Sequence, residues 1–127
     1  MSMFRTVYLV DVGILLTSDN EEFESYNVAY DHKYGYYDEN QFYMADKNKA
    51  IDFVNNYVND GIDMTYGIIS KTELPYEITD KEIDDGEVNV EDETYELNDV
   101  IYSTAKLNGK IEDNFIRVWM EGKEPQP

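Results

Sequence analysis

The sequence predicts an α+β fold, in which an antiparallel or mixed sheet carries one main helix at about residues 46–60 and ends in a C-terminal β-hairpin. Residues Phe4–Val12 carry apolar side chains on both parities, which is typical of a strand buried on both faces. Asp46 can cap a helix whose apolar residues recur at helical spacing. Asn108-Gly109 separates two alternating runs and favours a two-residue hairpin loop, because both positions need positive φ. The apolar residues of the helix are Ala50, Ile51, Val54, Tyr57 and Val58.

Turn signals divide the first half of the chain into further extended segments. Gly13 predicts a bulge or bend after the first strand, and Asp38-Glu39-Asn40 predicts a turn before an extended Phe42–Met44. Six of the twelve tyrosines lie between residues 26 and 43. Such a cluster is typical of a half-buried sheet face. The alternative is an interface hot spot, because the tyrosine ring is rigid and amphipathic.

The segment between the helix and the hairpin contains a strand and a helical turn. Gly61 is expected to end the main helix in a left-handed conformation, and Met64–Ser70 indicates a strand. Thr79 followed by Glu82 predicts a capping box for a single helical turn that Gly86 closes.

The two-residue loop fixes the register of the C-terminal hairpin. It pairs Leu107 with Lys110, and the same register pairs Tyr102 with Phe115. Trp119 is expected to seal the edge of the core.

The composition bounds the class of protein. A chain of 127 residues is expected to form a single domain over residues 1–120, with a frayed tail at 121–127. The 42 % hydrophobic and 14 % aromatic content excludes a disordered chain. The absence of cysteine excludes disulfides, thiolate zinc sites and cysteine nucleophiles. No apolar run approaches the ~20 residues that span a bilayer, so a cytoplasmic location is expected.

The formal net charge of -18 is the strongest functional signal. Almost half of the acid lies between Glu73 and Asp99, where twelve carboxylates accompany one base, Lys81. Unpaired charges are too costly to bury, so this stretch must face solvent or a positively charged partner. A chain this acidic binds nucleic acid and anionic membranes poorly and is steered toward basic surfaces.

Within the acidic stretch, apolar residues alternate with carboxylates. Val88 and Val90 form one alternating run, and Tyr95 and Leu97 form a second one after Asp92-Glu93. This pattern predicts a short acidic hairpin anchored to the core by the four apolar side chains. Its outer face would then be a lattice of negative charge. The residues expected to contact a partner are Asp84, Asp85, Glu87, Glu91, Asp92, Glu93, Glu96, Asp99, Tyr34, Tyr36 and Tyr37.

The sequence favours no catalytic site, metal or cofactor. His32 is the single histidine, and it follows Asp31, but adjacent strand residues point to opposite faces. Serine occurs in no nucleophile-elbow context. Asp80, Glu82 and Asp84 alternate as in an EF-hand loop. However, a glycine follows one residue late and long flanking helices are lacking. An acidic cation-binding module remains an alternative interpretation.

Size, carboxylate density and lack of cysteine make the chain similar to the small acidic inhibitors that phages and mobile elements direct against restriction and CRISPR nucleases. The resemblance lies in the acidic face around Glu87, Glu91, Asp92, Glu93 and Glu96. It implies an inhibitor, not an enzyme, whose carboxylates stand in for phosphates. Such a protein would occupy the basic groove of a nucleic-acid-binding protein, such as a CRISPR effector, and block nucleic-acid loading.

The alternative is an immunity protein or antitoxin that shields the active site of a toxin nuclease, with tyrosines as anchors. Salt separates the two hypotheses. The affinity of a mimic collapses as salt rises, whereas an interface with aromatic anchors persists. An enzyme with an unrecognised carboxylate site would instead lose turnover when one or two acids are replaced.

Overall fold

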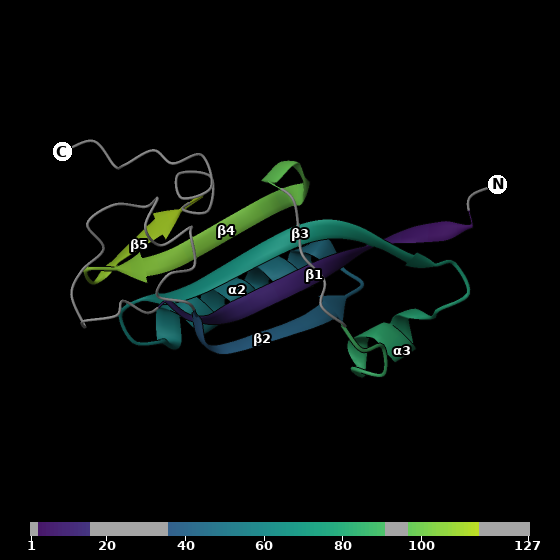
Figure 1. Cartoon of the computed structure of the whole chain (residues 1–127), viewed down its shortest axis with the longest axis horizontal. Helices are drawn as coiled ribbons and strands as arrows, with labels where there is room; N and C mark the ends of the chain where they lie inside the picture. Colours follow the sequence, from purple (N-terminus) through teal and green to yellow (C-terminus); the bar gives the residue numbers. More distant parts are fainter. Residues whose placement is uncertain (1–2, 16–35, 91–96, 115–127) are drawn as a thin grey trace.

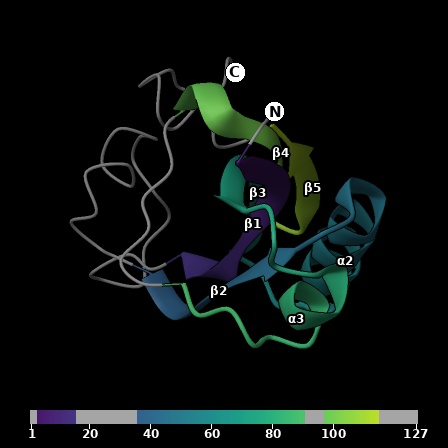
Figure 2. The same cartoon turned by 90° about the vertical axis from the view of Figure 1, so that its right-hand side faces the viewer.

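The computed structural model describes residues 3–15, 36–90 and 97–114. The elements are β1 (Phe4–Leu15), β2 (Tyr36–Met44), α2 (Lys47–Asp60), β3 (Thr65–Pro75), α3 (Asp80–Asp84), the 3-10 helix η1 (Leu97–Asp99), β4 (Val100–Leu107) and β5 (Lys110–Asp113). The five strands form one antiparallel sheet in the order β2-β1-β3-β4-β5 (Figure 1). Helix α2 lies along one side of this sheet (Figure 2). The predicted α+β fold with one main helix is confirmed. None of the described helices is long and apolar enough to cross a lipid bilayer.

Strand β1 lies inside the sheet, paired on one side with β2 and on the other with β3. Its alternate side chains therefore reach both faces of the sheet. Val10 and Val12 pack beneath α2, whereas Val7 and Leu9 point to the opposite face. Each of the four is at most 1 % exposed, which confirms the prediction of a strand buried on both faces.

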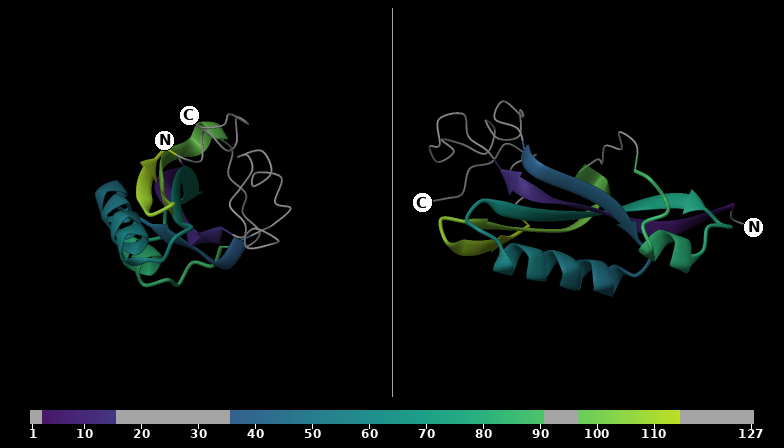
Figure 3. Two further views of the ribbon diagram at one scale, coloured as in Figure 1. Left: turned by 90° about the vertical axis from the view of Figure 1, so that its left-hand side faces the viewer. Right: turned by 90° about the horizontal axis from the view of Figure 1, so that it is seen from below.

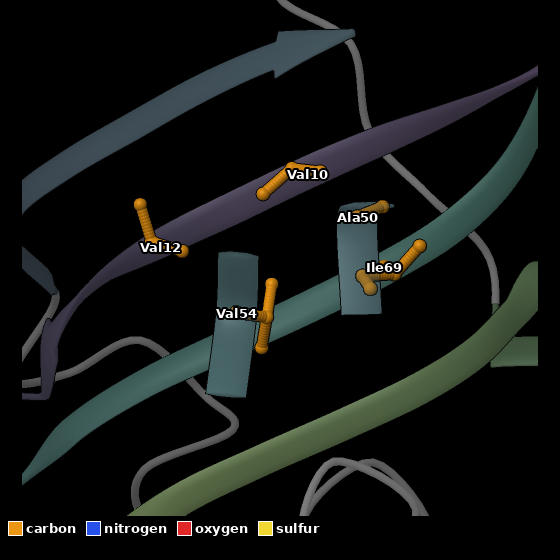
Figure 4. Close-up of a cluster of buried hydrophobic side chains, with 5 residues drawn as sticks. All are labelled: Val10, Val12, Ala50, Val54 and Ile69. Atoms are coloured by element: carbon orange, nitrogen blue, oxygen red, sulfur yellow. The ribbon is translucent and has the colours of Figure 1, made fainter. Parts of the chain in front are cut away.

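The core beneath α2 is built from small branched side chains (Figure 4). Ala50 and Val54, one turn apart on α2, face the sheet and are fully buried. Gly67 of β3 lets the helix approach closely, because a Cβ at this position would lie 2.3 Å from a methyl group of Val54. The cluster consists of Val10, Val12, Ala50, Val54 and Ile69.

Helix α3 and the residues after it cover part of the opposite face. Ile83 of α3 is 1 % exposed and packs with the side chains of Val7, Leu9 and Tyr43. Helix α3 lies at the end of the molecule where α2 begins, and Figure 3 shows both helices in one view. The two clusters therefore hold the two helices against a shared sheet.

Side chains form hydrogen bonds with backbone groups at both ends of α2. Asp46 caps the first turn, and its carboxylate accepts a hydrogen bond of 3.0 Å from the Lys49 N–H. At the other end, Lys106 donates to the carbonyl oxygens of Asn59 and Gly61, at 2.8 Å and 2.7 Å. The expected left-handed Gly61 is wrong, because its φ is -85° and its backbone is extended. A cation from β4 stabilises the last carbonyls instead.

The β4–β5 hairpin has the predicted loop. Leu107 pairs with Lys110, and the intervening Asn108 and Gly109 have φ of 55° and 78°. Strand β5 ends at Asp113. The predicted partner of Tyr102, at position 115, lies outside the described residues.

The predicted turn at Asp38-Glu39-Asn40 is wrong, because β2 runs through it without a break. Val12 pairs with Asn40, but Ile14 pairs with Tyr37, so two residues of β2 face one residue of β1. This bulge lies opposite Gly13, where the sequence predicted an irregularity. Long-range pairing with β1 thus overrides the local turn signal, and a bulge accommodates the polar residues.

Candidate functional site

Helix α3 forms because its own residues satisfy its first turn. The Thr79 hydroxyl accepts from the Glu82 N–H at 3.2 Å, and the Glu82 carboxylate accepts from the Thr79 N–H at 3.2 Å. This reciprocal pair is the predicted capping box. Gly86, with φ of 77°, follows the helix and turns the chain, as predicted. A five-residue helix is too short to persist alone, so tertiary contacts must hold it.

Three anchors fix α3 to the rest of the fold. Ile83 is buried in the core cluster opposite α2. The Arg5 guanidinium pairs with the Asp80 carboxylate and donates to the Ile78 carbonyl at 3.0 Å. The Asp84 carboxylate accepts from the backbone N–H of Ala45 at 3.2 Å, just ahead of α2. These three contacts together fix the orientation of α3, and with it the direction in which its outer side chains point.

The outer surface of α3 and its flanks is strongly acidic. Six exposed carboxylates lie within eleven residues, and we call them the acidic patch: Glu77, Asp80, Glu82, Asp84, Asp85 and Glu87. The segment carries one base, Lys81, which forms an ion pair of 2.6 Å with Asp85. Both partners of this pair are well exposed, so the pair is worth little in water. The Glu87 N–H donates to the Glu82 carbonyl at 3.0 Å, but the side-chain carboxylates of Glu77 and Glu87 have no hydrogen-bond or ion-pair partner among the described residues. The patch thus retains most of its charge.

The predicted acidic hairpin is wrong in its first arm. Residues 87–90 form no strand, although Val88 and Val90 are half-buried against the core cluster as expected. The two valines can bury their side chains against the face of the existing sheet, and this packing does not require residues 87–90 to pair with another strand. The predicted second arm lies outside the described residues up to position 96, and Leu97 begins η1.

The structure separates the predicted contact residues into groups. Asp84, Asp85 and Glu87 belong to the acidic patch, and Asp99 is an exposed residue of η1 just before β4. Tyr36 and Tyr37 lie in β2 opposite Leu15 and Ile14, at the far end of that strand from α3. Nine strand residues span about 26 Å, so β2 does not bring these two tyrosines to the patch. The remaining predicted positions lie outside the described residues: Glu91, Asp92, Glu93, Glu96 and Tyr34.

An apolar tip beside the acidic patch was not predicted from the sequence. Met3, Phe4 and Tyr76 are 77 %, 52 % and 69 % exposed, and the Tyr76 N–H donates to the Met3 carbonyl at 3.0 Å. They meet because residues 4–7 and 72–75 pair with each other beyond the described ends of β2 and β4. The three side chains are exposed because β2 and β4 are too short to cover this end of β1 and β3, which the sequence does not indicate. Aromatic and methionine side chains of this kind are enriched in protein interfaces.

The described carboxylates do not converge on a cation site. Asp80, Glu82 and Asp84 of the EF-hand-like pattern each engage a different partner: Arg5, Thr79 and Ala45. In the described segments no group of three or more acidic or histidine side chains is arranged to hold a metal ion. The buried Asp11 carboxylate, 2 % exposed, accepts a hydrogen bond of 2.9 Å from the Tyr66 hydroxyl. His32 lies outside the described residues.

Comparison of the chain with protein-family models, with curated proteins and with solved structures finds no match.

Proposed function

We propose that this protein is an acidic inhibitor that occupies the basic nucleic-acid-binding groove of a nuclease or another defence protein and blocks nucleic-acid binding. The observation that carries the proposal is the acidic patch, with six exposed carboxylates on and beside the short helix α3, which Arg5, Ile83 and Asp84 fix to the rest of the fold. A groove built to neutralise one charge per ~1.7 Å of duplex axis attracts such a fixed array of carboxylates.

The fixed position of α3 matters for affinity. A disordered acidic segment loses conformational entropy when it binds, whereas carboxylates on an anchored helix are already ordered. The capping box and the Ile83 contact remove that cost before the partner arrives. The net charge of -18 adds long-range steering, which can raise association rates by about 10- to 1,000-fold. We place this inhibition in the cytoplasm of a bacterial host cell.

The test is a charge-neutralising variant that leaves the anchors intact. Glu77→Gln, Asp85→Asn and Glu87→Gln together remove three negative charges from the acidic patch without touching Asp80 or Asp84. The matched control removes three exposed charges elsewhere by Asp52→Asn, Glu112→Gln and Asp113→Asn. Proteins captured by the immobilised chain from a bacterial lysate at low salt are identified and purified. The affinity of each variant for them is then measured with and without a competing duplex.

The proposal predicts that duplex DNA or RNA displaces the chain from its partner. It also predicts that the patch variant binds about tenfold weaker than the control variant, because the lost contacts are charge–charge contacts. A partner that holds chain and nucleic acid together refutes mimicry. Equal affinity of the patch variant and the control variant shows that α3 is not the contact surface.

The apolar tip supports a second candidate, an immunity protein or antitoxin bound to a toxin nuclease. Tyr76 and Phe4 lie beside the acidic patch and could serve as buried anchors in a shape-specific interface. In that case Tyr76→Ala weakens binding about tenfold or more, and affinity persists at high salt. A mimic shows the opposite pattern, since its affinity falls steeply with salt and responds little to Tyr76→Ala.

A further inference from the structure

An open groove beside the C-terminal half of α2 differs in chemistry from the acidic patch. Its volume is about 520 Å³, and its walls include the rings of Phe53 and Tyr57, the aliphatic side chains of Ile14 and Ile62, and the carboxylate of Asp60. Most of this lining is apolar, and one charged group lies at its edge. We call it the aromatic groove.

Helical spacing places the rings and the carboxylate on one face. Phe53, Tyr57 and Asp60 stand at positions i, i+4 and i+7 of α2. The Phe53 and Tyr57 rings are stacked, with centroids 6.2 Å apart and an interplanar angle of 23°. The Phe42 ring meets the Phe53 ring edge-on at 5.1 Å. These contacts hold the two rings in place, although Phe53 is 39 % exposed. Ile62, at 67 % exposed, adds apolar surface beside them.

Asp60 is the one charged residue among those that line the aromatic groove. Asp60 is the last residue of α2, where the helix dipole places its negative end. Within the described chain the side-chain carboxylate of Asp60 forms no ion pair and accepts no hydrogen bond. Lys106, the cation next to this helix end, donates instead to the carbonyls of Asn59 and Gly61. A carboxylate and two aromatic rings attract the same kind of group, a cation with an apolar stem.

We propose that the aromatic groove binds an arginine side chain from the surface of a basic partner protein. The planar guanidinium can stack on the ring of Phe53 or Tyr57 and form an ion pair with Asp60, while its methylene stem lies on Ile62. The inference rests on the proposed function in one respect, since the basic partner of the acidic patch supplies the arginine. The groove lies at the opposite end of α2 from α3, roughly 20 Å away along a helix of this length. It is therefore a second contact, which adds shape specificity to a charge-driven interface.

The test uses a defined peptide, so that it does not depend on the identity of the partner. The isotopically labelled full chain is titrated by NMR with N-acetyl-Gly-Arg-Gly-amide. The reference peptide replaces arginine by citrulline, which has the same shape and no charge. We expect saturable shifts of the backbone amides of residues 53–62 with the arginine peptide and none with the citrulline peptide. Asp60→Asn should weaken binding about fivefold, since it removes the ion pair and keeps the side-chain shape.

Two further variants keep the result interpretable. Phe53→Leu preserves apolar volume but removes one ring. It should also weaken binding of the arginine peptide, by about threefold. Asp52→Asn lies on the same helix outside the groove, has the same charge change, and should leave the affinity unaltered. Unchanged amide dispersion in each variant shows that the fold is intact.

Several outcomes overturn the inference. One is a set of shifts centred on residues 77–87 instead of the groove, and another is equal binding of the citrulline peptide or of the Asp60→Asn variant. A lysine peptide that binds as tightly as the arginine peptide refutes the assignment to a guanidinium. The proposed function fails separately, through the absence of competition by nucleic acid, and that result leaves a measured peptide site in place.

Discussion

Replacement of Gly67 by alanine tests how α2 is seated on the sheet. Gly67 lies in the middle of β3, and an added Cβ would be 2.3 Å from one methyl carbon of Val54 and 3.3 Å from two other carbons of that side chain. Carbon atoms in contact normally lie ~3.5–4.0 Å apart, so one of the two residues must shift. Val54 is fully buried, and a β-branched residue in a helix has one strongly preferred rotamer.

The expected cost follows from this geometry. Overpacking a buried site costs ~1–3 kcal/mol, and a contact this short belongs at the upper end of that range. The φ of Gly67 is not in the left-handed region, so alanine brings no backbone strain of its own. We therefore expect Gly67→Ala to lower the free energy of unfolding by about 3 kcal/mol. Val54→Ala alone should cost about 2 kcal/mol, because it removes two buried methyl groups.

A double-mutant cycle separates this clash from a general effect on the strand. In the Gly67→Ala, Val54→Ala double variant the new methyl group enters the space that the valine methyls leave. The double variant should therefore lose about 2–3 kcal/mol, well below the sum of the single losses. Urea unfolding monitored by circular dichroism measures each value, with the slope of the transition checked for constancy. A cost below about 1 kcal/mol for Gly67→Ala, or strict additivity in the cycle, would refute the close approach of α2 to β3.

Three further predictions concern α3, the end of α2 and the response to pH. Thr79→Ala removes the hydroxyl that accepts from the Glu82 N–H and should cost about 1 kcal/mol in urea unfolding, whereas Thr79→Ser should be close to neutral. Lys106→Met keeps the aliphatic stem but leaves two carbonyls at the end of α2 without their donor, and should cost about 1 kcal/mol in urea unfolding. Burial, and to a lesser degree the Asp113 charge, raises the pKa of Tyr102 above its ordinary 10.0, so the folded state keeps this proton to higher pH than the unfolded chain does. Its contribution to stability is therefore complete below pH 10.0 and is lost as pH rises through the folded-state pKa, and Tyr102→Phe should show a shallower loss in unfolding measured from pH 9 to 11. An equally steep loss in that variant would assign the alkaline dependence to other groups.

Local signals in the sequence were sufficient for the elements that satisfy themselves. Asp46 at the start of α2, the Thr79–Glu82 capping box and the Asn108-Gly109 loop depend on hydrogen bonds and φ angles within a few residues. The apolar residues on both parities of β1 indicated burial on both faces, because apolar side chains on each face of a strand are stabilised when that face is covered. The clustering of carboxylates around α3 could also be predicted from the sequence, because these residues are close together in the chain.

Tertiary structure determined four features that local signals did not predict. Val88 and Val90 had the pattern of a strand, but they pack on an existing sheet face without forming one. The turn expected at residues 38–40 became a bulge because pairing with β1 continues past it. Strand lengths exposed the apolar tip, and the approach of α2 to β1 and β3 created the aromatic groove. The physical reason is common to all four. Residue pairs far apart in the sequence determine pairing, exposure and concavity, and no periodicity within one segment records which segment will lie beside it.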